Sequence, residues 1–186
     1  MSQVVLLSGG IDSLVCAELA RAAGSLAGCV FVDYGHPAQV PEGWKAFAYC
    51  GERAVPLKVV HVFGLDLGDM GTHKGARVVP SRNAVLLSAA ANVLPALGGE
   101  SLVVGVNADD ADDYEDCRPA FVSRMSAALG VPIAAPLMGY NKRAIVAEAR
   151  RLGLSPSDAW SCYTAGPTPC GECPSCRLAL DAWSAP

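Results

Sequence analysis

Short apolar runs alternate along the chain with longer segments that carry helix signals. Five runs have the length and composition of buried strands: residues 4–7, 29–32, 58–62, 102–106 and 133–135. Helices are expected between and after them, over residues 12–23, 41–53, 83–97, 119–129 and the segment that follows Asn141. Because parallel strands covered on both faces are continuously apolar, this alternation predicts an α/β fold with a parallel five-stranded sheet and helices on both faces.

Residue types at the expected helix ends support this interpretation. Pro41 is suited to a first helical turn, and Ser81 and Asn141 are residue types that cap helix N-termini. The segment 109–116 is strongly acidic, and we expect it to be a loop.

The character of the sequence changes after residue 155, where Cys, Gly and Pro become frequent. Proline and glycine favour turns over long helices or strands. We therefore expect residues 1–155 to form one α/β domain, and residues 156–186 to form a small zinc-binding appendage packed on it.

Composition limits the classes of function. The chain has 186 residues, of which 52% are hydrophobic and 17% charged, which excludes a disordered chain. Its formal net charge of −4 lacks the basic excess of nucleic-acid-binding proteins, so no nucleic-acid partner is expected. No basic segment precedes the first apolar run, and residues 84–97 are too short and too interrupted to span a bilayer. We expect a cytoplasmic protein without membrane association, whose thiols stay reduced.

The first apolar run ends in a glycine turn with the sequence SGGIDS at residues 8–13, which leads into the first expected helix. At this place in an open α/β sheet, glycines let the backbone approach phosphate oxygens, and the helix start offers free N–H groups. Ser8 and Ser13 can add hydroxyl donors, and Asp12 can hold Mg²⁺. The alternative is a tight strand-to-helix turn in which Asp12 caps the helix.

Four of the eight cysteines lie together near the C-terminus, at Cys162, Cys170, Cys173 and Cys176. Two close C-x-x-C units that share Cys173 suit four thiolates around one tetrahedral Zn²⁺. Such a site has no open coordination position, so its expected role is structural. An iron–sulfur cluster and unliganded thiols are the alternatives.

The string SGGIDS resembles the PP-loop signature SGGxDS of the ATP pyrophosphatase superfamily. This resemblance implies the adenine nucleotide alpha hydrolase-like fold, and cleavage of ATP between its α and β phosphates with transfer of AMP to a substrate oxygen. ATP and Mg²⁺ are then the expected cofactors of the loop. The resemblance also implies which residues bind ATP: Leu7, Ser8, Gly9, Gly10, Asp12 and Ser13.

Further blocks of the sequence resemble the 7-cyano-7-deazaguanine synthase (QueC) family within that superfamily. SCY at 161–163 with CGECPSCRL at 170–178 is similar to the family's zinc motif, and VPSRN at 79–83 to its VPGRN. GV at 105–106, followed by Asp110, Tyr114 and DCR at 116–118, is similar to its GVxxxDxxGYPDCR. PLM at 136–138 and the following Asn141-Lys142 complete the resemblance.

This resemblance implies an ATP-dependent C–N ligase of queuosine biosynthesis. Its substrates are 7-carboxy-7-deazaguanine and ammonia, which react through an acyl-adenylate and an amide to give the nitrile, with release of AMP and pyrophosphate. The implied catalytic residues are Asp12, Arg82 and Lys142. Asp110, Asp116 and Arg118 are the implied contacts to the deazaguanine, and a homodimer is the implied assembly.

Several of these side chains also have a purely structural interpretation. Arg82 beside a helix start can form a structural salt bridge, and Lys142 in a first helical turn can be solvated. Most acidic runs are solvated, so within the segment 109–116 we expect only Asp110 and Asp116, which match the family block, to act. Cys117 matches as well, and we expect it to be a buried thiol.

The chain departs from the family pattern near the expected substrate. The family has YGQRHxxE after its second strand, whereas Tyr34-Gly35 is followed here by His36 and Pro37, without the Arg and the Glu at those places. The connection at residues 64–79 is short for the family, and its His73 and Lys74 could reach phosphates. Acidic residues flank Tyr114 where the family has Gly and Pro.

These departures leave alternatives open. One is a QueC-like paralogue that stops at the amide, or that joins the activated carboxylate to another amine such as a protein amine. A tRNA thiolation enzyme also has a PP-loop and cysteines, but it would need a basic RNA-binding surface. A non-enzymatic nucleotide-binding protein would not need Asp12 and both loop serines.

Overall fold

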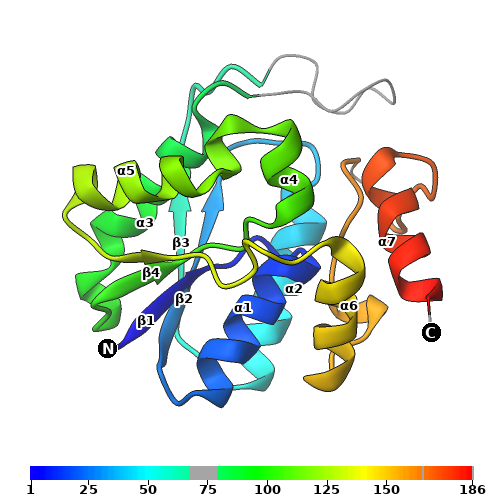
Figure 1. The fold of residues 1–186 in the computed structure, drawn as a ribbon, viewed down its shortest axis with the longest axis horizontal. Coiled ribbons are helices and arrows are strands. Elements are labelled where there is room, and N and C mark those ends of the chain that lie inside the picture. Colours follow the sequence, from blue (N-terminus) through cyan, green and yellow to red (C-terminus); the bar gives the residue numbers. More distant parts are fainter. Residues whose placement is uncertain (68–78, 165, 186) are drawn as a thin grey trace.

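The computed structural model describes residues 1–67, 79–164 and 166–185, and its centre is a parallel β-sheet (Figure 1). Five strands form the sheet in the order β3-β2-β1-β4-β5, and all neighbouring pairs are parallel. Their bounds are β1 (Gln3–Leu6), β2 (Leu26–Asp33), β3 (Leu57–His61), β4 (Ser101–Val103) and β5 (Ile133–Ala134). The predicted five-stranded parallel sheet is confirmed.

Helices cover both faces of this sheet, as the continuous apolar strands predict. On one face lie α1 (Ile11–Ala22), α2 (Gln39–Glu52) and α6 (Lys142–Arg151), and on the other lie α3 (Arg82–Val93) and α5 (Pro119–Leu129). Successive strand residues point to opposite faces, so Val5 packs in the core with α1 and Val4 in the core with α3. The strands therefore belong to two hydrophobic cores at once, which explains why they have no polar face.

Three expectations about local structure are wrong. The acidic segment is not a loop: it contains α4 (Ala108–Asp113) and a 3₁₀ turn (Glu115–Cys117), because the Asn107 side chain accepts a hydrogen bond from the Asp110 N–H and caps a helix there. The third expected helix ends at Val93, and a separate 3₁₀ turn (Pro95–Leu97) follows, because proline cannot continue the α-helical hydrogen bonding. The helix expected from Pro41 begins two residues earlier, at Gln39.

The caps expected for two helices have different outcomes. Asn141 caps α6 as predicted, since its side chain accepts a hydrogen bond from the Ala144 N–H at 2.9 Å. Ser81 occupies the N-cap position of α3, but its side chain makes no capping bond and its φ is +57°. The Asp116 carboxylate instead accepts a hydrogen bond from the N–H of Asn83 at 3.3 Å. A side chain distant in sequence thus replaces the local cap.

The C-terminal segment contains a 3₁₀ turn (Pro156–Asp158) and a helix, α7 (Pro174–Ser184), that packs beside α6 (Figure 1). Arg143 of α6 forms an ion pair with Asp181 at 3.0 Å, and Arg150 donates hydrogen bonds to the Trp183 and Ala185 carbonyls. The division into residues 1–155 and 156–186 stays a prediction. None of the helices in the described residues has both the length and the apolar character needed to cross a bilayer.

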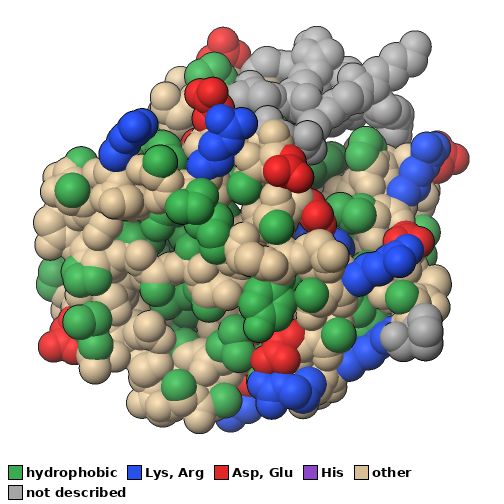
Figure 2. All heavy atoms as spheres, viewed as in Figure 1, with side chains coloured by type: hydrophobic (Ala, Val, Ile, Leu, Met, Phe, Trp, Pro, Cys, Tyr) green, Lys and Arg blue, Asp and Glu red, His purple; other side chains and the backbone are tan. Residues whose placement is uncertain are grey.

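Figure 2 shows one face of the molecule, on which Lys and Arg side chains lie among Asp and Glu side chains and between hydrophobic ones. The described residues on this face form no continuous basic surface.

The strand order reverses on either side of β1, so the loops that follow β1 and β4 diverge at the carboxyl edge of the sheet. Ligands of open α/β sheets bind in the crevice at such a point.

Candidate active site

A cavity of about 310 Å³ lies at this crevice and brings together most of the predicted site residues. Its walls come from the segment after β1, the segment after β4, the start of α3, the start of α6 and the C-terminal segment. The predicted residues that line it are Leu7, Ser8, Gly10, Asp12, Ser13, Arg82, Asp110, Asp116 and Lys142. Residues far apart in sequence therefore meet in one hollow of the size of a small-molecule site.

The glycine loop between β1 and α1 leaves a helix N-terminus open toward this cavity. The N-cap of α1 is Gly10, which has no side chain, and no described residue accepts from the N–H groups of Ile11, Asp12 and Ser13. The Ser13 hydroxyl donates to the Gly10 carbonyl at 2.8 Å, and it accepts from the Ser8 N–H at 3.2 Å. The loop is thus held by its own serines, while its unpaired N–H groups remain for an anion.

Two glycines allow the close packing of this loop. Gly9 has a φ of +82°, and a Cβ at this position would collide with the backbone carbonyl oxygen of Glu42. A Cβ on Gly105, in the segment after β4, would come within 3.1 Å of the backbone of Asp12 and Ser13. Gly9 therefore requires glycine for steric reasons, whereas a side chain at Gly105 would make tight contacts to which its neighbours would have to adjust. Gly9 supports the cavity from behind, since it does not line the cavity itself.

Lys142 and Asp12 form an ion pair across the cavity. The Lys142 ammonium lies 2.7 Å from both carboxylate oxygens of Asp12, and the two side chains are only 15% and 20% exposed. The Lys142 backbone N–H donates to Asp109, which helps to fix the start of α6. The solvated interpretation of Lys142 is therefore wrong. Asp109, which we expected to be solvated, also has a defined structural partner.

Asn107 joins the two carboxylates of the cavity and is a residue that the sequence interpretation missed. Its fully buried amide donates to Asp12 at 3.1 Å and to Asp110 at 2.7 Å. Burial, followed by the negative charge of Asp12, raises the pKa of Asp110 to about 6. A signal was present in the sequence, because Asn107 follows Gly105-Val106 at the carboxyl end of a predicted strand.

Arg82 stands at the first position of α3, between a tyrosine and an aspartate. Its side chain interacts with the Tyr34 hydroxyl, and Asp116 adds a favourable charge. These partners hold the pKa of Arg82 above its ordinary value although burial acts in the opposite direction. Arg82 is thus a positioned cation that lines the cavity. Tyr34, which precedes the departure from the family pattern, is not among the predicted site residues.

Three other predicted residues lie differently. Arg118 does not line the cavity, because its Nε donates to the Ala111 carbonyl and its guanidinium lies 3.5 Å from Glu115. Cys117 is buried, as expected, and burial raises the pKa of its thiol to about 12. His73 and Lys74 lie outside the described residues.

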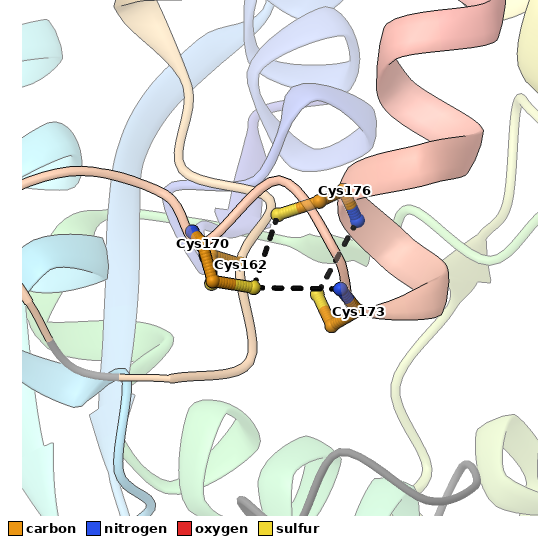
Figure 3. Close-up of side chains that lie close together, drawn as sticks. All are labelled: Cys162, Cys170, Cys173 and Cys176. Atoms are coloured by element: carbon orange, nitrogen blue, oxygen red, sulfur yellow. Dashed lines mark hydrogen bonds between the residues drawn. The ribbon is translucent and has the colours of Figure 1, made fainter.

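The four C-terminal cysteines form a second site beside the cavity (Figure 3). Their sulfur atoms all lie within 4.8 Å of one another, with Cys162 and Cys170 separated by 3.5 Å and Cys170 and Cys176 by 4.0 Å. Cys173 is the N-cap of α7, and Cys176 lies in its first turn. A metal ion with four sulfur ligands at about 2.3 Å requires sulfur separations of roughly 3.8 Å, so the cluster can hold a metal.

Backbone N–H groups point at the sulfur atoms of this cluster. Cys170 N–H donates to Cys162 Sγ, and Cys173 N–H donates to Cys170 Sγ, both at 3.4 Å. Donors on Glu172 and Cys173 lower the pKa of the Cys170 thiol to about 6. The backbone therefore stabilises thiolates, which is the form that binds a metal.

A tryptophan joins the cysteine cluster to the glycine loop. The Trp160 backbone N–H donates to the Gly9 carbonyl at 2.9 Å, and its indole N–H donates to the Cys162 carbonyl at 2.9 Å. The Trp160 side chain is buried in the same hydrophobic cluster as Cys162, Cys173 and Cys176. The C-terminal segment thus contributes directly to the wall of the cavity.

Comparison with known families identifies the chain. The family model described as "Queuosine biosynthesis protein QueC" matches residues 66–185, which is more than half of the sequence. The chain belongs to the QueC family. This QueC protein is 37% identical to 7-cyano-7-deazaguanine synthase 1 of Sphingopyxis alaskensis, with 94% of this chain and 90% of the relative covered. It is 39% identical to the 7-cyano-7-deazaguanine synthase of Novosphingobium aromaticivorans, with coverages of 94% and 86%.

Solved structures similar to this QueC protein show the fold alone, because their sequence identities are low. NMN synthetase from Francisella tularensis has a TM-score of 0.62 at 15% identity, with 100% of this chain and 79% of that chain covered. The U34-tRNA thiolase NcsA from Methanococcus maripaludis has a TM-score of 0.58 at 16% identity, with coverages of 97% and 63%. The expected PP-loop type of fold is confirmed.

Proposed function

We propose that this protein is a 7-cyano-7-deazaguanine synthase, an ATP-dependent C–N ligase of queuosine biosynthesis. The observation that carries the proposal is the cavity in which the open N-terminus of α1 faces Arg82 and Lys142. This arrangement suits a triphosphate whose charge must be offset during cleavage. Curated synthases match it over nearly their whole length, so a paralogue with another end point, a tRNA thiolation enzyme or a mere nucleotide-binding protein is not needed.

The reaction requires activation of a poor electrophile twice. A carboxylate oxygen of 7-carboxy-7-deazaguanine attacks the α-phosphorus of ATP, and pyrophosphate leaves. Ammonia then attacks the acyl carbon, and AMP leaves as the amide forms. The amide oxygen attacks the α-phosphorus of a second ATP, and pyrophosphate leaves. Loss of AMP together with both N–H protons then produces the nitrile. Each adenylation converts a poor leaving group, the oxygen of the carboxylate or of the amide, into AMP, which is a good leaving group.

Phosphate binding, charge stabilisation and substrate recognition can each be assigned to residues by their positions around the cavity. The unpaired N–H groups of the loop and the hydroxyls of Ser8 and Ser13 suit the phosphate oxygens of ATP. Arg82 and Lys142 suit the charge that develops as pyrophosphate leaves. Asp110 and Asp116 line the same cavity and are proposed to read the polar edge of the deazaguanine. Arg118 lies outside the cavity and donates a hydrogen bond to the Ala111 carbonyl, so it is proposed to position the acidic segment.

The carboxylate of Asp12 fits a magnesium ion. Mg²⁺ prefers carboxylate oxygens and is usually shared with substrate phosphates. Asp12 lies at the start of α1 beside the phosphate site, and the Asn107 amide orients its carboxylate. When bound, the ion would neutralise phosphate charge.

Zinc is the proposed occupant of the cysteine cluster. The sulfur separations suit one ion, whereas a cluster with several irons spreads its cysteine ligands over different metal atoms. Four protein ligands leave no coordination position for a substrate, so the ion would act structurally. We expect purified Cys173→Ser protein to lose bound zinc in metal analysis, and Cys16→Ser, outside the cluster, to keep it.

A homodimer is the proposed assembly. Val40, Trp44 and Phe47 lie on one face of α2 and are 60%, 70% and 53% exposed. An exposed apolar face of this kind favours a contact with another protein surface, here proposed to be a second copy. Trp44→Glu should shift the protein toward monomer in sedimentation experiments, and an unchanged dimer would contradict this surface. Cytoplasmic location stays a prediction.

The function is tested by product analysis. Purified protein with ATP, Mg²⁺, 7-carboxy-7-deazaguanine and ammonium should give the nitrile together with AMP and pyrophosphate in mass spectrometry. An amide that accumulates without nitrile would contradict the proposed end point. No substrate-dependent AMP would contradict the ligase assignment altogether.

A further inference from the structure

A buried histidine and a glutamate form a pair inside the cavity that the reaction scheme above does not use. His36 Nε2 lies 3.2 Å from the Glu42 carboxylate, and both side chains line the cavity. The exposed fractions are 5% for His36 and 20% for Glu42. A buried imidazole with a carboxylate partner and an open cavity in front is an arrangement that can hold a proton.

The surroundings fix this histidine from several sides. The Tyr34 ring stacks on the imidazole with 4.5 Å between ring centroids, and Tyr34 in turn contacts Arg82. The His36 carbonyl accepts a hydrogen bond from the Gln39 N–H, which ties the loop to the start of α2. Nδ1 of His36 has no hydrogen-bond partner among the described residues. One ring nitrogen is therefore oriented by Glu42, and the other is available to a ligand.

Glu42 also explains a departure from the family pattern. The sequence lacks the Glu of YGQRHxxE at its usual place after Tyr34-Gly35, but Glu42 in the first turn of α2 brings a carboxylate to the histidine. Burial raises the pKa of Glu42 above its ordinary value, and the hydrogen bond and charge of His36 offset only part of that rise. The pairing with His36 thus works against the cost of a charged carboxylate in a buried place.

The pair lies beside the phosphate loop, in the same cavity. A Cβ at Gly9 would collide with the backbone carbonyl oxygen of Glu42. The positive charge of Arg82 acts to lower the pKa of both Tyr34 and Glu42. His36 and Glu42 line the same cavity as the loop residues Ser8, Gly10 and Ser13. A substrate whose phosphate is bound by the loop therefore shares this cavity with the imidazole.

We propose that His36, oriented by Glu42, is the general base that removes N–H protons in the two steps after adenylation. The inference rests on the proposed function. In the first step His36 takes a proton from the ammonium-derived nitrogen as the C–N bond forms and the bond from carbon to AMP breaks. The first N–H proton of the amide is lost to water when its oxygen is adenylated. In the second step, His36 takes the other N–H proton as the C–O bond breaks and the electron pair forms the nitrile. Each time the proton goes from nitrogen to His36 and then to water, and no oxidant or reductant is required.

The test separates adenylation from the later steps. Exchange of labelled pyrophosphate into ATP, measured with 7-carboxy-7-deazaguanine but without ammonium, reports adenylation alone. We expect His36→Ala to keep this exchange within about threefold of wild type and to lower nitrile formation by about 100-fold to 10,000-fold, the range for a lost general base. Added imidazole should restore part of the lost nitrile formation, which a merely structural role would not allow. Glu42→Gln should lower nitrile formation by about tenfold and also keep the exchange.

His61 provides a matched control. It is also paired with a carboxylate, that of Asp33 at 3.3 Å, but it is 55% exposed and does not line the cavity. His61→Ala should leave both exchange and nitrile formation near wild type. The proposal is overturned if His36→Ala loses exchange and nitrile formation to the same degree, retains full activity, or is not rescued by imidazole. Wild-type protein without exchange would instead contradict the proposed function itself.

Discussion

The two walls of the cavity are built in different ways. The side-chain hydrogen bonds of the glycine loop after β1 join residues at most five positions apart, from Ser8 to Ser13, and one backbone bond reaches it from Trp160. The acidic segment after β4 is held by bonds that reach Asp12, Asn83 and Lys142 in other elements. One wall is therefore specified mainly by local bonds, and the other is specified by the fold.

This difference explains what each wall can do. The loop offers backbone N–H groups, which suit phosphates whatever substrate is activated. The acidic segment offers side chains whose charge depends on their neighbours, as the raised pKa of Asp110 shows. Substitutions in the loop should therefore lower the rate of adenylation in general. Substitutions in the acidic segment should instead change how activity depends on pH and on the deazaguanine.

The largest effect is expected for Gly9→Ala. A Cβ would collide with the Glu42 backbone, and a φ of +82° adds about 1–3 kcal/mol of strain. We expect pyrophosphate exchange to fall by about 1,000-fold, equivalent to about 4 kcal/mol. Gly24→Ala is the control, because it has a φ of +67° but open space around the new Cβ. Equal losses in the two variants would show that strain alone matters.

A smaller effect is expected for Lys142→Met, which keeps the length of the side chain and removes its charge. The loss of one group that stabilises developing charge should lower kcat of adenylation by about 100-fold. Arg143→Met, at the neighbouring exposed position, should retain activity because its ion pair with Asp181 lies on the surface. If Lys142→Met is as active as Arg143→Met, the Lys142 charge has no part in adenylation.

Removal of the buried amide tests the acidic wall itself. Asn107→Ala would leave the carboxylates of Asp12 and Asp110 without their shared donor and open the cap of α4. We expect the free energy of unfolding to fall by about 2 kcal/mol in urea titrations. Asn92→Ala, exposed on α3, should change it by less than about 0.5 kcal/mol.

The smallest effect is a pH dependence carried by Asp110. Its pKa is about 6 in the folded protein, while an unfolded chain has a value of about 4. Between these values the unfolded state loses the proton first, so ionisation favours unfolding as the pH rises. Relative to Asp110→Asn, wild type should lose about 1–2 kcal/mol of stability from pH 4 to pH 6.5. Parallel stability curves for the two proteins would contradict the raised pKa.

The sequence predicts those parts of the fold whose signals are local. The strands are found within one to three residues of their expected ends, since each is a continuous apolar run. Helix α5 is found at its expected bounds, 119–129, because Pro119 opens it and Gly130 follows it. The loop residues that line the cavity were also predicted from their motif.

Features that depend on contacts across the fold were predicted less well. The composition of the acidic segment is typical of a solvated loop, and only the cap from Asn107 in the structure shows that it contains a helix. Helix α7 was not predicted, because cysteines and prolines around its start mask the helix pattern. His36 and Glu42 are six positions apart, and nothing in the local pattern pairs them until α2 brings the carboxylate back. Asp116 stands at the α3 N-terminus only because α3 and the acidic segment pack together.

The hydrogen bond from Trp160 to Gly9 has a consequence for synthesis of the protein. A ribosome makes the glycine loop well before it makes residue 160, which supplies the backbone donor that holds Gly9. Contacts so distant in sequence form late, because the intervening chain must first be closed into a loop. A nascent chain that has folded most of its sheet therefore still lacks the hydrogen bond that holds its nucleotide loop, until Trp160 has been made and has packed against Gly9.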